Sequence, residues 1–436
     1  MVQPVLQLNN VSVDYDMEEG TVHAVRGATY ELLDNETLAL VGESGCGKSQ
    51  SSYAAIGLVQ PPGEVSGEIL FRPDAQSPPV NLLTLSRNSK AMRQIRGGHI
   101  GMIFQEPMSS LSPVHRIGYQ IDEVLQLHEG LPADERFLRG LLTWAGRLVG
   151  LAFGAGVGFL GGWAAAWVVW LVLTGLRGLL NLGWKALHLA PWAGDSWFWT
   201  RDTWLWLFWI LGTMTLAVLG WRAGRRLVGR RQRLRRKARA VELLTQVGIP
   251  DADRQYGRYS FEFSGGMRQR VMIAIALACN PRVLFADEPT TGLDVTIQAQ
   301  ILELIRSLQR RTRMSTVLIT HDLAVVAERA DRVAIMYLGR IVELADVYTL
   351  FSTPRHPYTV ALMRSVVGSP LTAEGRLATI RGTVPGPLEE VPGCPFHPRC
   401  DSFIPGVCDR IVPEFKSVDD KTQTACHLYN GRPKGA

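Results

Sequence analysis

The 436-residue sequence predicts an α/β fold, and two motifs at the ends of apolar segments support this class. Apolar residues 38–41 run into the glycine-rich segment GESGCGKS at 42–49, which a helix-compatible stretch follows. A second apolar segment, VLFA at 283–286, runs directly into two acids. Polar motifs at the carboxyl ends of buried strands are typical of a parallel sheet covered by helices.

The first motif has the spacing of a phosphate-binding P-loop, G-x4-G-K-S, between a strand and a helix. Its glycines let the backbone wrap a phosphate chain, while Lys48 reaches the β and γ phosphates and Ser49 binds Mg²⁺. A glycine-rich turn without a ligand is the alternative, but the complete strand, loop and helix context argues against it. The residues expected to bind the nucleotide here are Gly42, Glu43, Ser44, Gly45, Cys46, Gly47, Lys48, Ser49 and Gln50.

The second motif places Asp287 and Glu288 side by side at the end of a predicted buried strand. This arrangement fits an aspartate that holds Mg²⁺ through water and a glutamate that polarises an attacking water molecule. A solvated strand end is the alternative for one such pair taken alone.

Three further segments, FSGGMRQR, TTGLD and VLITHD, follow in an order that resembles the ATP-binding subunits of ABC transporters. The first of these segments, FSGGMRQR, matches the signature of that family. The resemblance implies that this signature clamps the γ-phosphate bound at the P-loop of an opposing subunit. Phe263 and Met267 stand where the usual LSGGQ signature has leucine and glutamine. The matched residues are Ser264, Gly265 and Gly266 in the signature, Gln105 in the Q-loop, Asp294 in the D-loop, His321 in the switch and Tyr15 as the aromatic that stacks on adenine.

This resemblance also implies an ATP hydrolase. Glu288 would orient the water, with Gln105 and His321 as the other catalytic residues. Mg²⁺ would be held by Ser49, Gln105 and Asp287. Phosphoryl transfer to water needs positioning and charge neutralisation more than covalent help, and these residues supply both.

Longer strings such as GMIFQEPMSSLSPVHRIGYQI and RHPYTVALMRSV resemble the subunits that energise import of dipeptides, oligopeptides or nickel. The expected solute is a peptide, and nickel or another small solute is the alternative. The chain holds one P-loop, so a second ATPase subunit, a related chain or a second copy, is expected to complete each ATP site. Two permease subunits and an extracytoplasmic solute-binding protein are the other implied partners, at the cytoplasmic side of the inner membrane.

The C-terminal tail gathers four of the six cysteines, Cys394, Cys400, Cys408 and Cys426. No CxxC pair occurs among them, and structural disulfides are not expected in a reducing compartment. Four thiolates could hold a 4Fe-4S cluster or a structural zinc. The resemblance of this tail to the cysteine-rich end of peptide-importer ATPases implies the cluster, with zinc and unliganded thiols as alternatives.

An insertion at about residues 137–235 separates segments that are continuous in the resembling family. It contains two uncharged stretches, 148–176 and 203–221, and each is long enough for a helix to cross a bilayer. Cations cluster outside this pair of stretches, so both ends of the predicted transmembrane hairpin are expected on the cytoplasmic side. A pair of buried helices in a soluble core is the alternative.

Four segments are therefore predicted. They are an ATPase core at 1–136, a hairpin with a basic flank at 137–235 that is inserted into the helical subdomain, a second part of the ATPase core at 236–345, and a small cysteine-rich extension at 346–436. Ten cations lie between Arg222 and Arg239, and without them the formal charge of +6 becomes −4. The basicity is local, so nucleic acid is not expected as a partner. An exporter half-subunit and a nucleic-acid ATPase with a zinc finger are the weaker alternatives.

Overall fold

The computed structural model describes residues 3–74, 76–106, 110–128, 215, 222, 230–365 and 380–429. The chain divides into two compact units, of which the first comprises Met1–Glu129 and Ala238–Ala436 and the second Gly130–Lys237. In the second unit, residues 230–237 are helical. The first unit carries the sheets described next.

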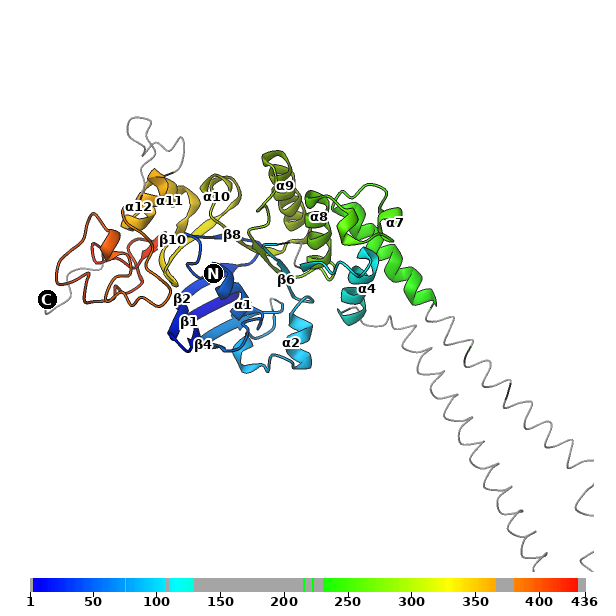
Figure 1. Cartoon of the computed structure of the whole chain (residues 1–436), viewed down its shortest axis with the longest axis horizontal. Coiled ribbons are helices and arrows are strands. Elements are labelled where there is room, and N and C mark those ends of the chain that lie inside the picture. The colour runs from blue at the N-terminus through cyan, green and yellow to red at the C-terminus, as the bar shows by residue number, and fades with distance from the viewer. Residues whose placement is uncertain are drawn as a thin grey trace, which may run out of the picture. The chain divides into compact units, whose positions relative to one another are not determined.

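Two sheets form the first unit (Figure 1). The antiparallel four-stranded sheet has the order β2-β1-β4-β5, and the eight-stranded sheet has the order β11-β12-β10-β9-β3-β8-β7-β6. In the larger sheet the strands β9, β3, β8, β7 and β6 are parallel to one another. The strand β10 is antiparallel to β9, β12 is antiparallel to β10, and β11 is antiparallel to β12. The strand bounds are β1 Pro4–Met17, β2 Gly20–Leu33, β3 Thr37–Val41, β4 Gly63–Phe71, β5 Val80–Asn81, β6 Ile100–Ile103, β7 Val283–Asp287, β8 Ser315–Thr320, β9 Arg332–Tyr337, β10 Arg340–Asp346, β11 Lys416–Ser417 and β12 Thr422–Thr424.

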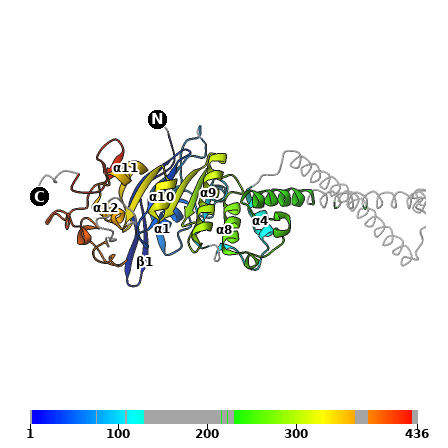
Figure 2. The same ribbon diagram turned by 90° about the horizontal axis from the view of Figure 1, so that it is seen from above.

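Helices pack against both sheets. The helix α1 contacts β1 and β2, α10 contacts β3 and β8, and α4 packs with α8 in a helical cluster (Figures 1 and 2). The bounds are α1 Lys48–Ala55, α2 Lys90–Ile95, α4 Ile117–His128, α7 Ala252–Gln255, α8 Gly265–Ala276, α9 Val295–Thr312, α10 Leu323–Arg329, α11 Val347–Ser352 and α12 Pro357–Arg364, with single 3-10 turns η1 Leu82–Thr84, η2 Ser260–Glu262 and η4 His397–Arg399. Residues 238–246 are also helical.

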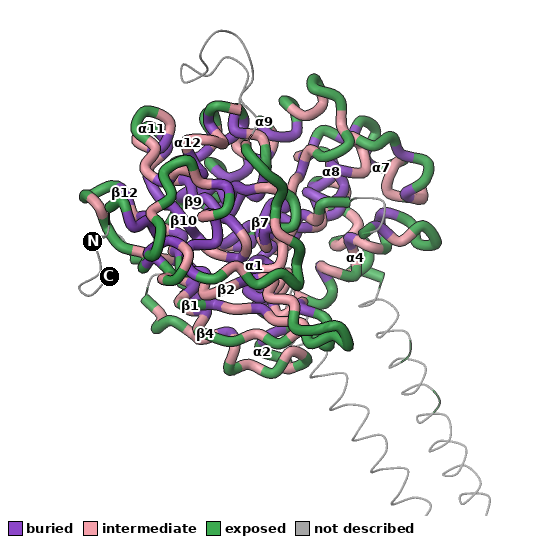
Figure 3. Tube along the Cα trace, turned by 60° about the vertical axis from the view of Figure 1, so that its left-hand side comes forward, coloured by how far each residue is buried: buried purple, intermediate pink, exposed green. Residues whose placement is uncertain are grey.

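The central strands of the larger sheet are buried on both faces (Figure 3). Leu38 and Leu40 of β3 belong to the core shared with the four-stranded sheet, while Ala39 and Val41 belong to the core beneath α10, α11 and the C-terminal segment. Successive side chains of a strand point to opposite faces, so an unbroken apolar run is what a central strand requires. The predicted strands at 38–41 and 283–286 are therefore confirmed as β3 and β7.

The two predicted membrane spans, 148–176 and 203–221, lie outside the described residues except for Thr215. Among the residues that are described, no helix combines the length and the apolar character needed to cross a bilayer.

Candidate functional site

The P-loop joins the end of β3 to the start of α1, and glycine determines its backbone. Gly45 and Gly47 have φ values of 79° and 101°, which residues with side chains rarely adopt. A Cβ atom on Gly42 would lie 2.2 Å from the carbonyl oxygen of Met336 on β9. The loop therefore packs tightly against the neighbouring strand and turns directly into the helix N-terminus.

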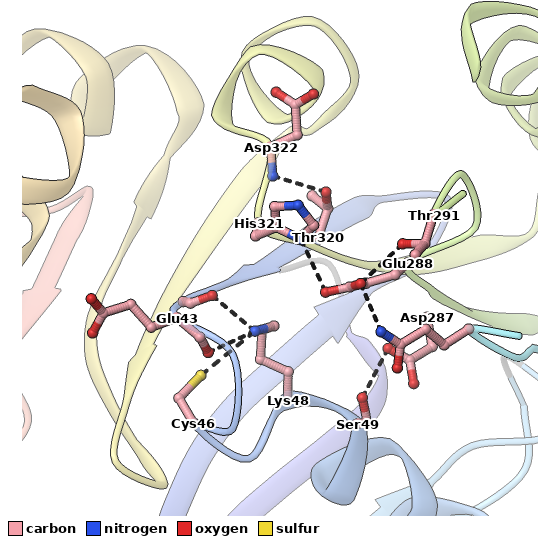
Figure 4. A network of polar contacts seen from close by, with 12 residues as sticks. Glu43, Cys46, Lys48, Ser49, Asp287, Glu288, Thr291, Thr320, His321 and Asp322 are labelled. Carbon is pink, nitrogen blue, oxygen red and sulfur yellow. Dashed lines mark hydrogen bonds and ion pairs between the residues drawn. The ribbon is translucent and has the colours of Figure 1, made fainter. Parts of the chain in front are cut away.

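Lys48 is the first residue of α1 and is only 5% exposed. Its Nζ donates hydrogen bonds to the carbonyl oxygens of Gly42 at 2.8 Å and Glu43 at 3.0 Å. Figure 4 shows the ammonium within the curve of the loop. A cation in this place lies beside the backbone N–H groups and the helix N-terminus, where a phosphate group binds most favourably.

Ser49 and Asp287 bring together the ends of two motifs that are 238 residues apart. The hydroxyl of Ser49 donates to Oδ1 of Asp287 at 3.0 Å, and Asp287 is fully buried. Within the described part of the chain, Oδ2 of Asp287 has no hydrogen-bond partner. Burial raises the pKa of this carboxyl group, so its charged form gains from a nearby cation. A hydroxyl and an unpaired carboxylate oxygen are hard donors that fit Mg²⁺.

Glu288 accepts three hydrogen bonds through its two carboxylate oxygens (Figure 4). Gln105 Nε2 donates to Oε2 at 2.9 Å, Thr291 Oγ1 donates to the same oxygen at 3.0 Å, and His321 Nδ1 lies 3.1 Å from Oε1. Burial acts to raise the pKa of Glu288, but the hydrogen bonds from His321 and Thr291 outweigh it, and the pKa is lowered. The side chain therefore stays charged and is oriented from three sides.

The positions of these groups follow from the parallel sheet. The P-loop follows β3, Gln105 lies two residues after β6, Glu288 follows β7, and His321 follows β8. Parallel strands end at the same edge of the sheet, so segments far apart in the sequence meet there. The structure thus brings together the predicted catalytic residues and the predicted P-loop. Gln105, also predicted as a Mg²⁺ ligand, uses its amide nitrogen for Glu288.

Tyr15 lies on β1, and its hydroxyl donates to Oε1 of Gln50 on α1 at 2.7 Å. The predicted adenine-stacking residue is therefore fixed beside the helix that follows the P-loop. Burial raises the pKa of this phenol, so Tyr15 is neutral and available as an aromatic face.

The predicted signature and D-loop residues are placed at helix N-termini. Ser264 caps α8 by accepting from the backbone N–H of Met267 at 3.4 Å, and Asp294 caps α9 by accepting from that of Ile297 at 3.0 Å. A Cβ atom on Gly266 would lie 2.8 Å from Cγ2 of Ile297. Ser264, Gly265 and Asp294 are exposed, and the side-chain hydrogen bonds of Ser264 and Asp294 stay within the first turns of their own helices.

The four C-terminal cysteines are all unpaired. The backbone N–H of Cys394 donates to the carbonyl of Cys408 at 2.7 Å. The pKa of Cys394 is raised to about 12 and that of Cys426 to about 11, mainly by burial and in part by the neighbouring thiols, which include Cys400 and Cys408. The four side chains therefore gather in one region. Among the described residues, no three His, Cys, Asp or Glu side chains have an arrangement that could hold a metal ion.

One further group of residues was not predicted. Arg399 pairs with Glu43 of the P-loop, and the hydroxyl of Tyr358 accepts from the backbone N–H of Glu43 at 3.1 Å. Thr291, the third partner of Glu288, was also missed. Arg399 and Glu43 lie 356 residues apart, and no local pattern links them. The only sequence signal was the position of Arg399 next to Cys400.

The site can therefore bind the phosphates of a nucleotide, hold a divalent cation and orient water with a charged carboxylate. Lys48 and the loop amides serve the first task, Ser49 and Asp287 the second, and Glu288 the third. These are the requirements of phosphoryl transfer to water.

Comparison with known proteins gives consistent matches. The family model described as "ABC transporter" matches residues 25–291, and the model described as "Oligopeptide/dipeptide transporter, C-terminal region" matches residues 342–408. The chain is 36% identical over 425 residues to the dipeptide transport ATP-binding protein DppD of Haemophilus influenzae, which covers 97% of this chain and 95% of that protein. It is 35% identical over 437 residues to DppD of Bacillus subtilis, which covers 100% of this chain and 98% of that protein. The dimeric structure of MJ0796, a bacterial ABC transporter cassette, aligns at 19% identity with a TM-score of 0.48, covering 78% of this chain and 98% of that chain.

Proposed function

The chain belongs to the ABC transporter family, among the ATP-binding subunits of dipeptide and oligopeptide transport systems, and on this basis we propose that it hydrolyses ATP to power peptide import. One structural observation carries the proposal. The carboxylate of Glu288 accepts from Gln105, Thr291 and His321 at the edge of the sheet where the P-loop and the Ser49–Asp287 pair also lie.

The P-loop residues Gly42 to Gln50 bind ATP. The backbone N–H groups and Lys48 contact the phosphates, and Tyr15 stacks on the adenine. Mg²⁺, when bound through Ser49 and Asp287, with Gln105 as the third candidate ligand, neutralises phosphate charge. Glu288 orients the attacking water and accepts its proton, and His321 and Gln105 hold the carboxylate in place.

The proposal is tested by comparing Glu288→Gln with Lys48→Ala in the full chain. The amide of Glu288→Gln keeps the shape but loses the charge, so nucleotide binding should persist while turnover falls about 100-fold or more. Lys48→Ala should instead weaken binding itself, because it removes the phosphate contact. Nucleotide binding and phosphate release measure the two effects. Turnover near the wild-type rate in Glu288→Gln would show that another residue orients the water.

Di- or oligopeptides are the proposed solutes. The family model for the C-terminal region of oligopeptide and dipeptide transporters and the dipeptide-transport names of the two DppD relatives support this choice. A nickel or other small-solute importer is the alternative. The proposed partners are a second ATPase subunit that presents its own signature, two permeases and an extracytoplasmic solute-binding protein. Ser264, Gly265, Gly266 and Asp294 would act at that partner's ATP site.

The ATPase works at the cytoplasmic side of the inner membrane. Residues 148–176 and 203–221 are proposed to form a transmembrane hairpin that anchors the subunit beside its permease. Their uncharged sequences and the ten flanking cations support this proposal.

The four C-terminal cysteines are proposed to hold a 4Fe-4S cluster, with structural zinc as the alternative. Cys394, Cys400, Cys408 and Cys426 lie in one region and are soft donors suited to either group. No three described side chains are arranged to hold a metal ion in this structure, so binding would have to draw the four thiols together. A bound cluster or zinc would favour the thiolate form of these cysteines. Without a bound metal, burial favours the neutral thiol.

A further inference from the structure

Arg399 connects the cysteine-rich C-terminal segment directly to the P-loop. Its Nη1 and Nη2 donate to the two carboxylate oxygens of Glu43 at 2.8 Å and 3.1 Å. The Arg399 side chain is 5% exposed and that of Glu43 is 24% exposed. A two-point ion pair of this kind fixes the orientation of both side chains, and its low exposure limits screening by water.

Two further N–H groups of Arg399 are also occupied. Nε donates to the carbonyl oxygen of Arg381 at 3.0 Å, and Nη1 donates to the hydroxyl of Tyr337 at 3.2 Å. On the other side of the pair, the hydroxyl of Tyr358 accepts from the backbone N–H of Glu43. Glu43 is thus held through its backbone and its side chain by residues that follow β8 in the sequence.

The turn that carries Arg399 is bounded by two of the four cysteines. Arg399 is the last residue of η4, which begins at His397. The carbonyl of Cys394 accepts from the backbone N–H of His397 at 3.0 Å and lies 2.9 Å from its Nδ1. Cys400 follows Arg399 directly, and its N–H donates to the carbonyl of His397 at 3.3 Å. The position of the guanidinium therefore depends on how this segment is ordered.

Glu43 is a sensitive point of the P-loop for two reasons. Its carbonyl oxygen is one of the acceptors that hold the Nζ of Lys48. Its carboxylate is a negative charge on the loop that binds phosphates, and in Figure 4 it points away from Lys48. Lys48 therefore does not neutralise it, whereas Arg399 does. An unpaired carboxylate on this loop would repel an incoming triphosphate.

We propose that Arg399 is a positioning residue for ATP binding, which holds the P-loop through Glu43, neutralises that carboxylate and makes nucleotide affinity depend on the cysteine-rich segment. The inference rests on the proposed function, because it takes ATP as the ligand of this loop. Arg399 does not touch the reacting atoms, so the effect belongs to binding and not to the chemical step.

The first test measures affinity for a fluorescent ATP analogue with Mg²⁺ and steady-state ATP hydrolysis on the full chain in mild detergent. In Arg399→Ala the Kd and the KM should rise about 3- to 30-fold, while kcat changes by less than about twofold. Arg410→Ala is the matched control, because Arg410 is exposed in the same segment. Its affinity should equal that of the wild type.

A second-site change separates charge neutralisation from a general loss of structure. In Arg399→Ala/Glu43→Gln the uncompensated carboxylate is gone, so affinity should recover towards that of Glu43→Gln alone. If Arg399→Ala does not fold, Arg399→Gln replaces it, because glutamine keeps much of the volume and some hydrogen-bonding groups. Arg399→Gln should lose nucleotide affinity in the same way and recover it when combined with Glu43→Gln.

The link to the cysteines is tested by Cys400→Ser in two backgrounds. The change should weaken nucleotide binding in the wild-type chain and have little effect in Glu43→Gln, because the path runs through the ion pair. The inference is overturned if Arg399→Ala binds nucleotide as the wild type does, if Glu43→Gln restores nothing, or if Cys400→Ser acts equally in both backgrounds. Failure of the wild-type chain to bind ATP would instead overturn the proposed function.

Discussion

Asp287 shows how a single residue can oppose folding and serve function. It is fully buried, its Oδ2 lacks a hydrogen-bond partner in the described part of the chain, and burial raises its pKa. A carboxyl group with a raised pKa in the folded state reduces stability once the pH is high enough to ionise it. Its ordinary pKa is 3.8, so the cost is absent below that pH, grows as the pH rises from 3.8 to the raised value, and is complete above the raised value.

We therefore expect Asp287→Asn to raise the melting temperature of the nucleotide-free chain at pH 7 and to leave it unchanged below pH 3.8. The same change should lower Mg²⁺-dependent ATP hydrolysis about 100-fold or more, because the amide is a poorer ligand for the cation. Thermal unfolding at several pH values and a hydrolysis assay measure both effects.

Asp322→Asn is the control for this change. Asp322 caps α10 by accepting from the N–H of Ala324 at 2.9 Å, and asparagine caps a helix equally well. Asp322→Asn should change neither the melting temperature nor the rate of ATP hydrolysis. Equal or lower stability of Asp287→Asn at pH 7 would contradict the electrostatic account of Asp287.

Sequence reasoning found the residues of this site whose neighbours are local. Lys48 and Ser49 belong to one loop, and Asp287 and Glu288 end one apolar strand, so short motifs identified them. It missed Arg399, because the partner of a buried arginine is set by the tertiary fold and not by spacing along the chain. The capping roles of Ser264 and Asp294 are local, and a sequence can predict them because serine and aspartate are preferred N-cap residues.

At the scale of elements, the central strands were predictable and the peripheral sheet was not. β3 and β7 are unbroken apolar runs because they are buried on both faces. β1 and β2 alternate less regularly, and their pairing contains several register shifts. Such irregularities depend on contacts between strands, so a single sequence gives no sign of them.

The C-terminal segment is the element whose chemistry is most open to direct test. If its four cysteines hold the proposed cluster, anaerobically purified protein should be brown, with broad absorbance near about 400 nm and about four irons and four sulfides per chain. Metal and sulfide analysis of the full chain measures this.

Cys279→Ser is the matched control, because Cys279 precedes β7 in the chain and lies outside the C-terminal segment. It should keep the colour, whereas Cys408→Ser should lose it. Colourless wild-type protein with one zinc per chain would replace the cluster with the zinc alternative.

At the scale of the whole molecule, the insertion should govern attachment and not catalysis. Neither stretch carries a charged side chain, whereas solute pathways usually need polar groups. Deletion of residues 137–235, with a short linker joining the flanks, should leave ATP binding intact but release the chain from membranes. The full chain should resist carbonate washing. Fractionation followed by a nucleotide-binding assay measures both.

Two outcomes would contradict this view of the insertion. A full-length chain that washes off would identify the insertion as a soluble helical addition. A deleted chain that assembles normally with the permeases but supports no transport would place the two stretches in the pathway or its gate.

The central claim is that ATP hydrolysis at this site drives peptide import, and uptake into proteoliposomes tests it most directly. The vesicles would contain the full chain with its co-purifying subunits, ATP on the side of the ATPase and a labelled dipeptide with the solute-binding protein on the other. The wild-type complex should accumulate the dipeptide only with ATP and Mg²⁺, and the Glu288→Gln complex should not. Equal accumulation by the two complexes, or ATP-driven uptake of nickel in place of the dipeptide, would contradict the account.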